Sequence, residues 1–128
     1  MGVMNNTGTP LNLDGVERHL LFTLNAVDEI QEHFDLPLQE VIGKLLKDDS
    51  AEETLKGLLV ILFNDEVERL SYNGKECNIE KVDDRQIGWM LTNDNVIYAI
   101  TSVLTAYGCD LPKQDEDDPN AKSGTQMK

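Results

Sequence analysis

The residues of this chain best suited to chemistry are its histidines and its paired carboxylates. His19 and His33 both lie in the stretch HLLFTLNAVDEIQEHF, residues 19–34. An imidazole can serve as a general base or a metal ligand, but neither an HExxH motif nor a nucleophile elbow surrounds these two. Strand alternation and helical spacing place both on the polar sides of their elements. We therefore expect both histidines to be surface residues.

Adjacent carboxylates occur at Glu52-Glu53 and at Asp83-Asp84. Two carboxylates can share acid–base catalysis, but each pair lies where a helix is predicted to begin, and negative charge there interacts favourably with the helix dipole. The segments KDDS and QDEDDPN lack the glycine and the closing glutamate of a calcium-binding EF-hand loop. The residues thus predict no catalytic group, no metal ligand and no cofactor.

The composition describes a single acidic domain. The chain has 128 residues, a net charge of −13 and a pI near 4.3, and most of that charge belongs to residues 1–109. Such a charge disfavours nucleic acids and anionic membranes as partners. Cys77 and Cys109 form no CxxC pair and are expected to be free thiols. The longest apolar run, residues 58–63, is too short to span a membrane, so a soluble intracellular protein is expected.

Periodicity predicts a β-hairpin at the N-terminal end of the domain. Asp14-Gly15 is typical of a two-residue hairpin turn, which would pair Leu13 with Val16 and Leu11 with Arg18. Alternation then gives the hairpin and the residues after it one apolar face, formed by Leu11, Leu13, Val16, Leu20 and Phe22.

Helical spacing takes over after Phe22. A first helix, capped by Thr23 or Asn25, has an apolar side of Leu24, Val27, Ile30 and Phe34. Leu36-Pro37 interrupts it, and a second helix at about 37–47 buries Leu38, Val41, Ile42, Leu45 and Leu46.

Three further helices are predicted downstream. Ser50 and Glu53 have the spacing of a capping box, so a third helix starts at Ala51 and runs to about residue 70. Asp83 and Gln86 offer a second capping box for a fourth helix. The fifth runs from about residue 93 or 94 to 107, with Asp94 in its first turn and Gly108 after its end. Its predicted inner face holds Ile97, Ile100, Val103 or Leu104, and Tyr107.

Two features of the sequence could belong to a site that binds a partner protein. The block LLVILF, residues 58–63, is apolar all round, which favours a buried central helix over a groove for a partner. Trp89 is expected in the core, although tryptophan is also enriched at the centres of protein interfaces. If a partner groove exists, its predicted residues are Leu59, Ile61, Phe63 and Trp89.

The domain organisation follows from composition. Residues 1–9 form a flexible arm, residues 10–109 one hairpin-plus-helices domain, and residues 110–128 a disordered acidic tail too poor in apolar side chains to fold. The predicted fold class is mainly α: an N-terminal β-hairpin followed by a compact bundle of about five helices.

Taken together, these segments resemble a protein family. The pattern LNLDGVERHLLFTLNAVDEIQEHFDLPLQEVIGKL, then LLVILFNDEVERL, then VDDRQIGWMLTNDNVIYAITSVLTAYG and the tail DEDDPNAKSGTQ is similar to phage tail assembly chaperones, the small acidic helical proteins of long-tailed phages and prophages of Gram-positive bacteria. The resemblance covers most of the chain and rests on overall pattern, without a catalytic or ligand motif.

The resemblance implies a non-enzymatic protein of viral tail morphogenesis. Such chaperones act in the host cytoplasm, bind the tape measure protein, help recruit tail tube protein subunits and are absent from the mature virion. Some are also made in a longer, frameshifted form. Self-association is left open. The alternative interpretation is an acidic nucleic-acid mimic that inhibits a DNA-binding protein. A third is a small enzyme, for which the sequence shows no recognisable set of catalytic residues.

Overall fold

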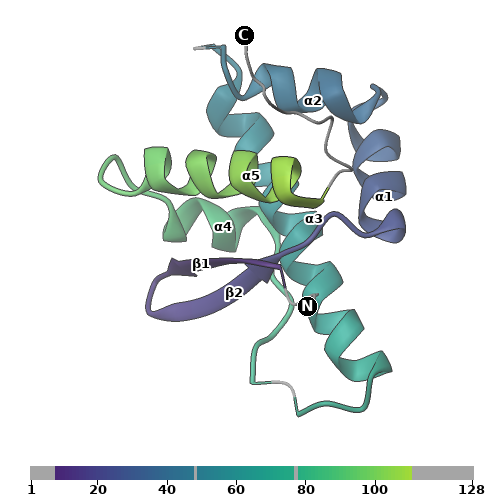
Figure 1. Ribbon diagram of the computed structural model, residues 1–128. Helices are drawn as coiled ribbons and strands as arrows, with labels where there is room; N and C mark the ends of the chain where they lie inside the picture. Colours follow the sequence, from purple (N-terminus) through teal and green to yellow (C-terminus); the bar gives the residue numbers. More distant parts are fainter. Residues whose placement is uncertain (1–7, 48, 77, 111–128) are drawn as a thin grey trace, which may run out of the picture.

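The computed structural model describes residues 8–47, 49–76 and 78–110. A two-stranded antiparallel hairpin precedes five helices, which confirms the predicted mainly-α fold class. Figure 1 shows the long third helix in the centre of the molecule, with the hairpin and the other helices around it. Most of the predicted arm and most of the predicted acidic tail lie outside the described residues. Of the arm, Gly8 and Thr9 are described: Gly8 precedes the first strand and Thr9 is its first residue. Of the tail, Asp110 is described and is the last residue of the last helix.

The hairpin has the predicted turn and register. Strand β1 (Thr9–Leu13) pairs with β2 (Val16–Leu20), with Leu13 opposite Val16 and Leu11 opposite Arg18. Asp14 and Gly15 both have positive φ, 57° and 78°, as a two-residue turn of this kind requires. Leu11, Leu13 and Leu20 are buried as predicted, but Val16, next to the turn at the start of β2, is exposed, contrary to prediction.

Thr23 joins the hairpin to helix α1 (Leu24–Phe34). Its hydroxyl oxygen accepts a 3.1 Å hydrogen bond from the backbone N–H of Ala26, so Thr23 is the N-cap. The same hydroxyl donates to Asp65 on the central helix, at 3.0 Å. This anchor sets the rotation of α1 so that Ala26 and Ile30 are buried, and Leu24, predicted on the inner side, is 84 % exposed.

Helix α2 (Leu38–Lys44) begins directly after Pro37, as predicted, but ends earlier. The N–H groups of Leu46 and Lys47 each bond three residues back, at 3.1 and 3.2 Å, which tightens the chain into a 3₁₀-type turn. The tighter turn rotates Leu46 outward, so the prediction that it is buried is wrong. The other predicted inner residues are buried: Leu38, Val41, Ile42 and Leu45.

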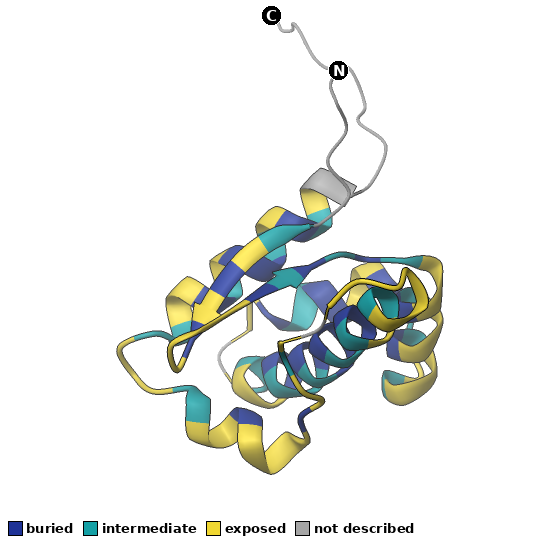
Figure 2. Ribbon diagram, turned by 90° about the horizontal axis from the view of Figure 1, so that it is seen from below, coloured by how far each residue is buried: buried dark blue, intermediate teal, exposed yellow. Residues whose placement is uncertain are grey.

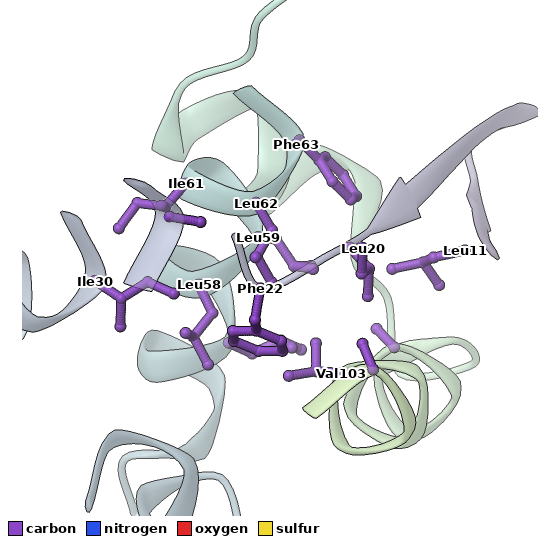
Figure 3. Packing of buried hydrophobic residues seen from close by; sticks show 14 of the residues in the cluster. Leu11, Leu20, Phe22, Ile30, Leu58, Leu59, Ile61, Leu62, Phe63 and Val103 are labelled. Carbon is purple, nitrogen blue, oxygen red and sulfur yellow. The ribbon is translucent and has the colours of Figure 1, made fainter. Parts of the chain in front are cut away.

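Helix α3 (Ala51–Tyr72) is the centre of the core. Buried residues occur on every side of its middle turns, which confirms the central-helix interpretation of residues 58–63; Figure 3 shows several of them between the hairpin, α1 and the last helix. The start at Ala51 is as predicted, but the Ser50 side chain makes no capping hydrogen bond. Its ψ of 4° departs from the extended backbone that a capping side chain needs.

Residues 78–83 form an irregular segment held against α3. The side chain of Asn64 bonds both backbone groups of Val82, at 2.8 Å each, and Arg18 donates to the carbonyl of Glu80 at 3.1 Å. Helix α4 (Asp84–Met90) then starts with the predicted capping box, in which Asp83 and Gln86 each accept from the other's backbone N–H.

Helix α5 (Val96–Asp110) begins later than predicted. Asn95 accepts a 2.8 Å bond from the N–H of Thr92, so residues 92–95 form a turn that leaves Asp94 ahead of the helix. The buried side is Ala99, Ser102, Val103 and Ala106, and Ile97 is 68 % exposed, contrary to prediction. Gly108 lies within the helix rather than after it. Figure 2 shows how buried residues concentrate on the inner sides of the elements.

The two capping signals generate a stability prediction. We expect Asp83→Ala to lower the free energy of unfolding by about 1 kcal/mol, because the carboxylate that accepts the hydrogen bond from the Gln86 N–H is lost. Ser50→Ala is the matched control and should change it by less than about 0.5 kcal/mol. Urea denaturation followed by circular dichroism measures both. Equal losses in the two variants would contradict the capping assignment.

Candidate functional site

His19 is held by two carboxylates rather than open to solvent. Its backbone N–H donates to Glu66 Oε1 at 2.7 Å, its Nδ1 lies 2.9 Å from Glu66 Oε2, and its Nε2 lies 3.2 Å from Glu17 Oε2. The His19 side chain is 30 % exposed and the Glu66 side chain 6 %. The expectation that His19 is a surface residue holds only in part: the side chain is partly exposed, but it also ties β2 to α3.

Asp65, next to Glu66, completes this cluster. Its Oδ2 accepts from Thr23 at 3.0 Å and from Arg69 Nε at 3.1 Å. Arg69 also approaches the carbonyl of His19, at 3.5 Å. We call His19, Thr23, Asp65, Glu66 and Arg69 the carboxylate cluster. Its hydrogen bonds fix the positions of β2 and α1, which is a structural role.

The sequence contains a signal for the carboxylate cluster that the periodicity of apolar residues does not reveal. Asp65 and Glu66 follow the apolar block of α3 after Asn64 and are both buried, at 8 % and 4 % exposure. Charged side chains are rarely buried without partners, so a carboxylate pair within a central helix indicates neighbouring donors. His33, by contrast, is exposed as expected and stacks edge-on against Phe34, with ring centroids 4.7 Å apart.

The other carboxylate pairs lie at helix starts. Asp83 caps α4, Asp84 lies 3.5 Å from Lys56, and Glu52 and Glu53 are exposed in the first turn of α3. No group of three or more histidine, cysteine, aspartate or glutamate side chains within the described ranges could hold a metal ion. Cys77 and the side chain of Cys109 lie outside those ranges.

The four predicted groove residues do not lie together. Leu59 and Phe63 are fully buried and Ile61 is 5 % exposed, so all three pack in the core and present no surface to a partner in this structure (Figure 3). Trp89 is 70 % exposed, so its expected place in the core is wrong. Partner binding at these positions stays a prediction, with Trp89 the accessible member.

Trp89 stands on the outer side of α4. Ile87, two residues earlier and about 200° around the helix, is the residue that α4 buries. The Arg85 guanidinium lies 5.5 Å from the centre of the indole ring, one turn back along the same side. This cation–π contact orients the ring at the surface and leaves most of it open to a partner.

A shallow pocket of about 250 Å³ adjoins this part of α4. Gly88 and Leu91 line it together with the start of α3 and the turn into α5; the remaining lining residues are Glu52, Lys56, Thr92, Asn93 and Val96. Sites for drug-sized ligands are usually larger, at roughly 300–1,000 Å³. This pocket is smaller than that, and its lining mixes charged, polar and apolar side chains.

No family model, curated protein or solved structure matches the chain. None of the helices in the described part of the chain is long and apolar enough to cross a membrane.

The carboxylate cluster generates a second stability prediction. We expect Glu66→Ala to lower the free energy of unfolding by roughly 2–3 kcal/mol, because a buried charged acceptor is lost and the His19 N–H loses its partner. Glu68→Ala, also on α3, is the control. It removes an exposed ion pair with Lys81 and should lower the free energy of unfolding by at most about 1 kcal/mol. Thermal and urea unfolding measure the difference. A smaller loss for Glu66→Ala than for Glu68→Ala would refute the anchoring role.

Proposed function

We propose that this protein is a non-enzymatic tail assembly chaperone of a phage or prophage. It binds the tape measure protein and helps recruit tail tube subunits in the host cytoplasm, and it is absent from the mature virion. The observation that carries the proposal is the exposure of Trp89 on the outer side of α4. The similarity of the sequence to that family supplies the identity of the partners.

An exposed tryptophan is a suitable anchor for a helical partner. Trp is the residue type most enriched among interface hot spots, and burial of its large ring against an apolar surface contributes much of the binding energy. The pocket beside Gly88 can receive a neighbouring apolar side chain of the same partner. A helix with apolar residues spaced by three and four would engage both features.

Exposed acidic side chains near α4 determine which charge is favourable on the partner beside its contact with Trp89. Asp83, Asp84, Glu52 and Asp94 are all exposed near the two ends of this helix. They favour basic residues beside the partner's apolar stripe and increase the rate of encounter with it. A tape measure protein not yet enclosed by its tube exposes such stripes, which aggregate unless covered.

The proposal predicts a complex that depends on Trp89. Co-expression should keep the tape measure protein soluble, and the two proteins should co-purify. Trp89→Ala should weaken the binding of tape measure fragments by about tenfold or more, because truncation removes the anchor, and isothermal titration calorimetry measures the affinity. Tyr72→Ala is the control, because Tyr72 is 90 % exposed at the end of α3 and should affect neither folding nor binding.

Two outcomes would contradict the proposal. One is the absence of any complex with tape measure protein or tail tube subunits. The other is binding that Trp89→Ala and Tyr72→Ala affect equally. Salt-sensitive binding of a basic DNA-binding protein that persists in Trp89→Ala would support nucleic-acid mimicry instead.

A further inference from the structure

Both ring nitrogens of His19 face carboxylate oxygens. Nδ1 lies 2.9 Å from Glu66 Oε2 on α3, and Nε2 lies 3.2 Å from Glu17 Oε2 on the same strand. An ionised carboxylate only accepts hydrogen bonds, so each contact needs a ring nitrogen that donates. A neutral imidazole has one donor nitrogen and an imidazolium has two. The surroundings of the ring therefore fit the doubly protonated, positively charged form.

The charge balance of the carboxylate cluster favours the same form. The side chains of Asp65 and Glu66 are only 9 % and 6 % exposed, and buried carboxylates are rarely left without a counter-charge. The Arg69 guanidinium lies 3.1 Å from Asp65 and balances that carboxylate. Glu66 faces His19 instead. A protonated His19 gives the cluster two cations for its two buried carboxylates.

The other elements that pack against β2 bring no further charge to the ring within the described ranges. Strand β1 has no titratable side chain. Of the tyrosines on α5, Tyr98 bonds β1 through its hydroxyl and Tyr107 packs against the core. Arg18, the neighbour of His19 in β2, lies over the Phe63 ring. The charged groups around the His19 ring thus come from α3 and from β2 itself.

We propose that His19 is an imidazolium in the folded protein at neutral pH, and that this charge makes the attachment of β2 to α3 sensitive to pH. When the pH rises, Nδ1 keeps its proton, because the buried Glu66 carboxylate has little water to replace that donor. Nε2 loses its proton beside Glu17, whose side chain is 58 % exposed and is then free to turn into solvent. The contact with Glu66 remains as the weaker hydrogen bond of a neutral ring.

Proton linkage gives the direction of the effect. An imidazole in an unfolded chain titrates near pH 6.5, at about its ordinary value, so above that pH folding takes up a proton at His19. A proton that only the folded state binds makes stability fall as the pH rises. The stabilisation is complete below about pH 6.5 and is lost as the folded His19 is titrated at higher pH. The inference is independent of the proposed function, because it rests on His19 and not on Trp89.

Nitrogen NMR of the full chain tests the charge directly. At pH 7.5 the His19 ring should give the signals of an imidazolium, with both nitrogens protonated. His33 is the internal reference, because its ring stacks on Phe34 and forms no ion pair with a described residue, so it should be mostly neutral. A His19 ring as neutral as that of His33 at this pH would overturn the proposal.

Urea unfolding at a series of pH values tests the effect on stability. Between pH 6.5 and pH 8.5 the unfolding equilibrium constant of the wild type should rise by about tenfold or more, since one linked proton changes it by up to tenfold per pH unit. His33→Gln is the matched control and should show the same rise. Glu17→Gln keeps the buried contacts of His19 and should show a smaller rise, because one of the two carboxylates that favour the imidazolium is lost.

His19→Gln removes the titrating group and should abolish most of the rise. A rise in His19→Gln as large as in His33→Gln would overturn the proposal. If His19→Gln does not fold, the comparison of Glu17→Gln with His33→Gln decides: equal rises in these two variants would also overturn it.

Discussion

The middle of α3 has no polar side, and the remaining elements are arranged to cover it. Residues 58–63 are apolar around the whole circumference of the helix, so exposure of any side would cost hydrophobic free energy. The hairpin, α1, α2, α4 and α5 all contact α3 for this reason. A chain of this size can enclose one such helix and little more, which explains why the domain has a single core.

Where the apolar block ends, buried carboxylates fix the direction of the covering elements. Asp65 and Glu66 hold Thr23 and His19, which orients α1 and β2 on α3. The same contacts occupy the outer edge of β2, since the His19 N–H and carbonyl both face side chains of α3. The Asn12 N–H of β1 donates to the Tyr98 hydroxyl at 3.1 Å. A two-stranded hairpin, marginal alone, is thereby stabilised at both edges.

The buried polar groups hold the fold together. The carboxylates of Asp65 and Glu66 and the side chain of His19 tie β2 and α1 to α3. Trp89, by contrast, is 70 % exposed on α4, where it lies beside Arg85 and near a shallow pocket, so its indole ring is accessible from solvent.

The sequence by itself determined the features that depend on neighbouring residues. The Asp14-Gly15 turn and its register, the Thr23 and Asp83 caps, the start of α3 at Ala51 and its central position were all predictable, because turn geometry, capping and apolar density act within a few residues. The tertiary structure decided which sides of the short helices face inward. Leu24, Leu46, Ile97 and Trp89 are exposed, and His19 is engaged, because the rotation of each helix is set by distant contacts such as Thr23 with Asp65. A periodic pattern of apolar residues is too broad to fix that rotation.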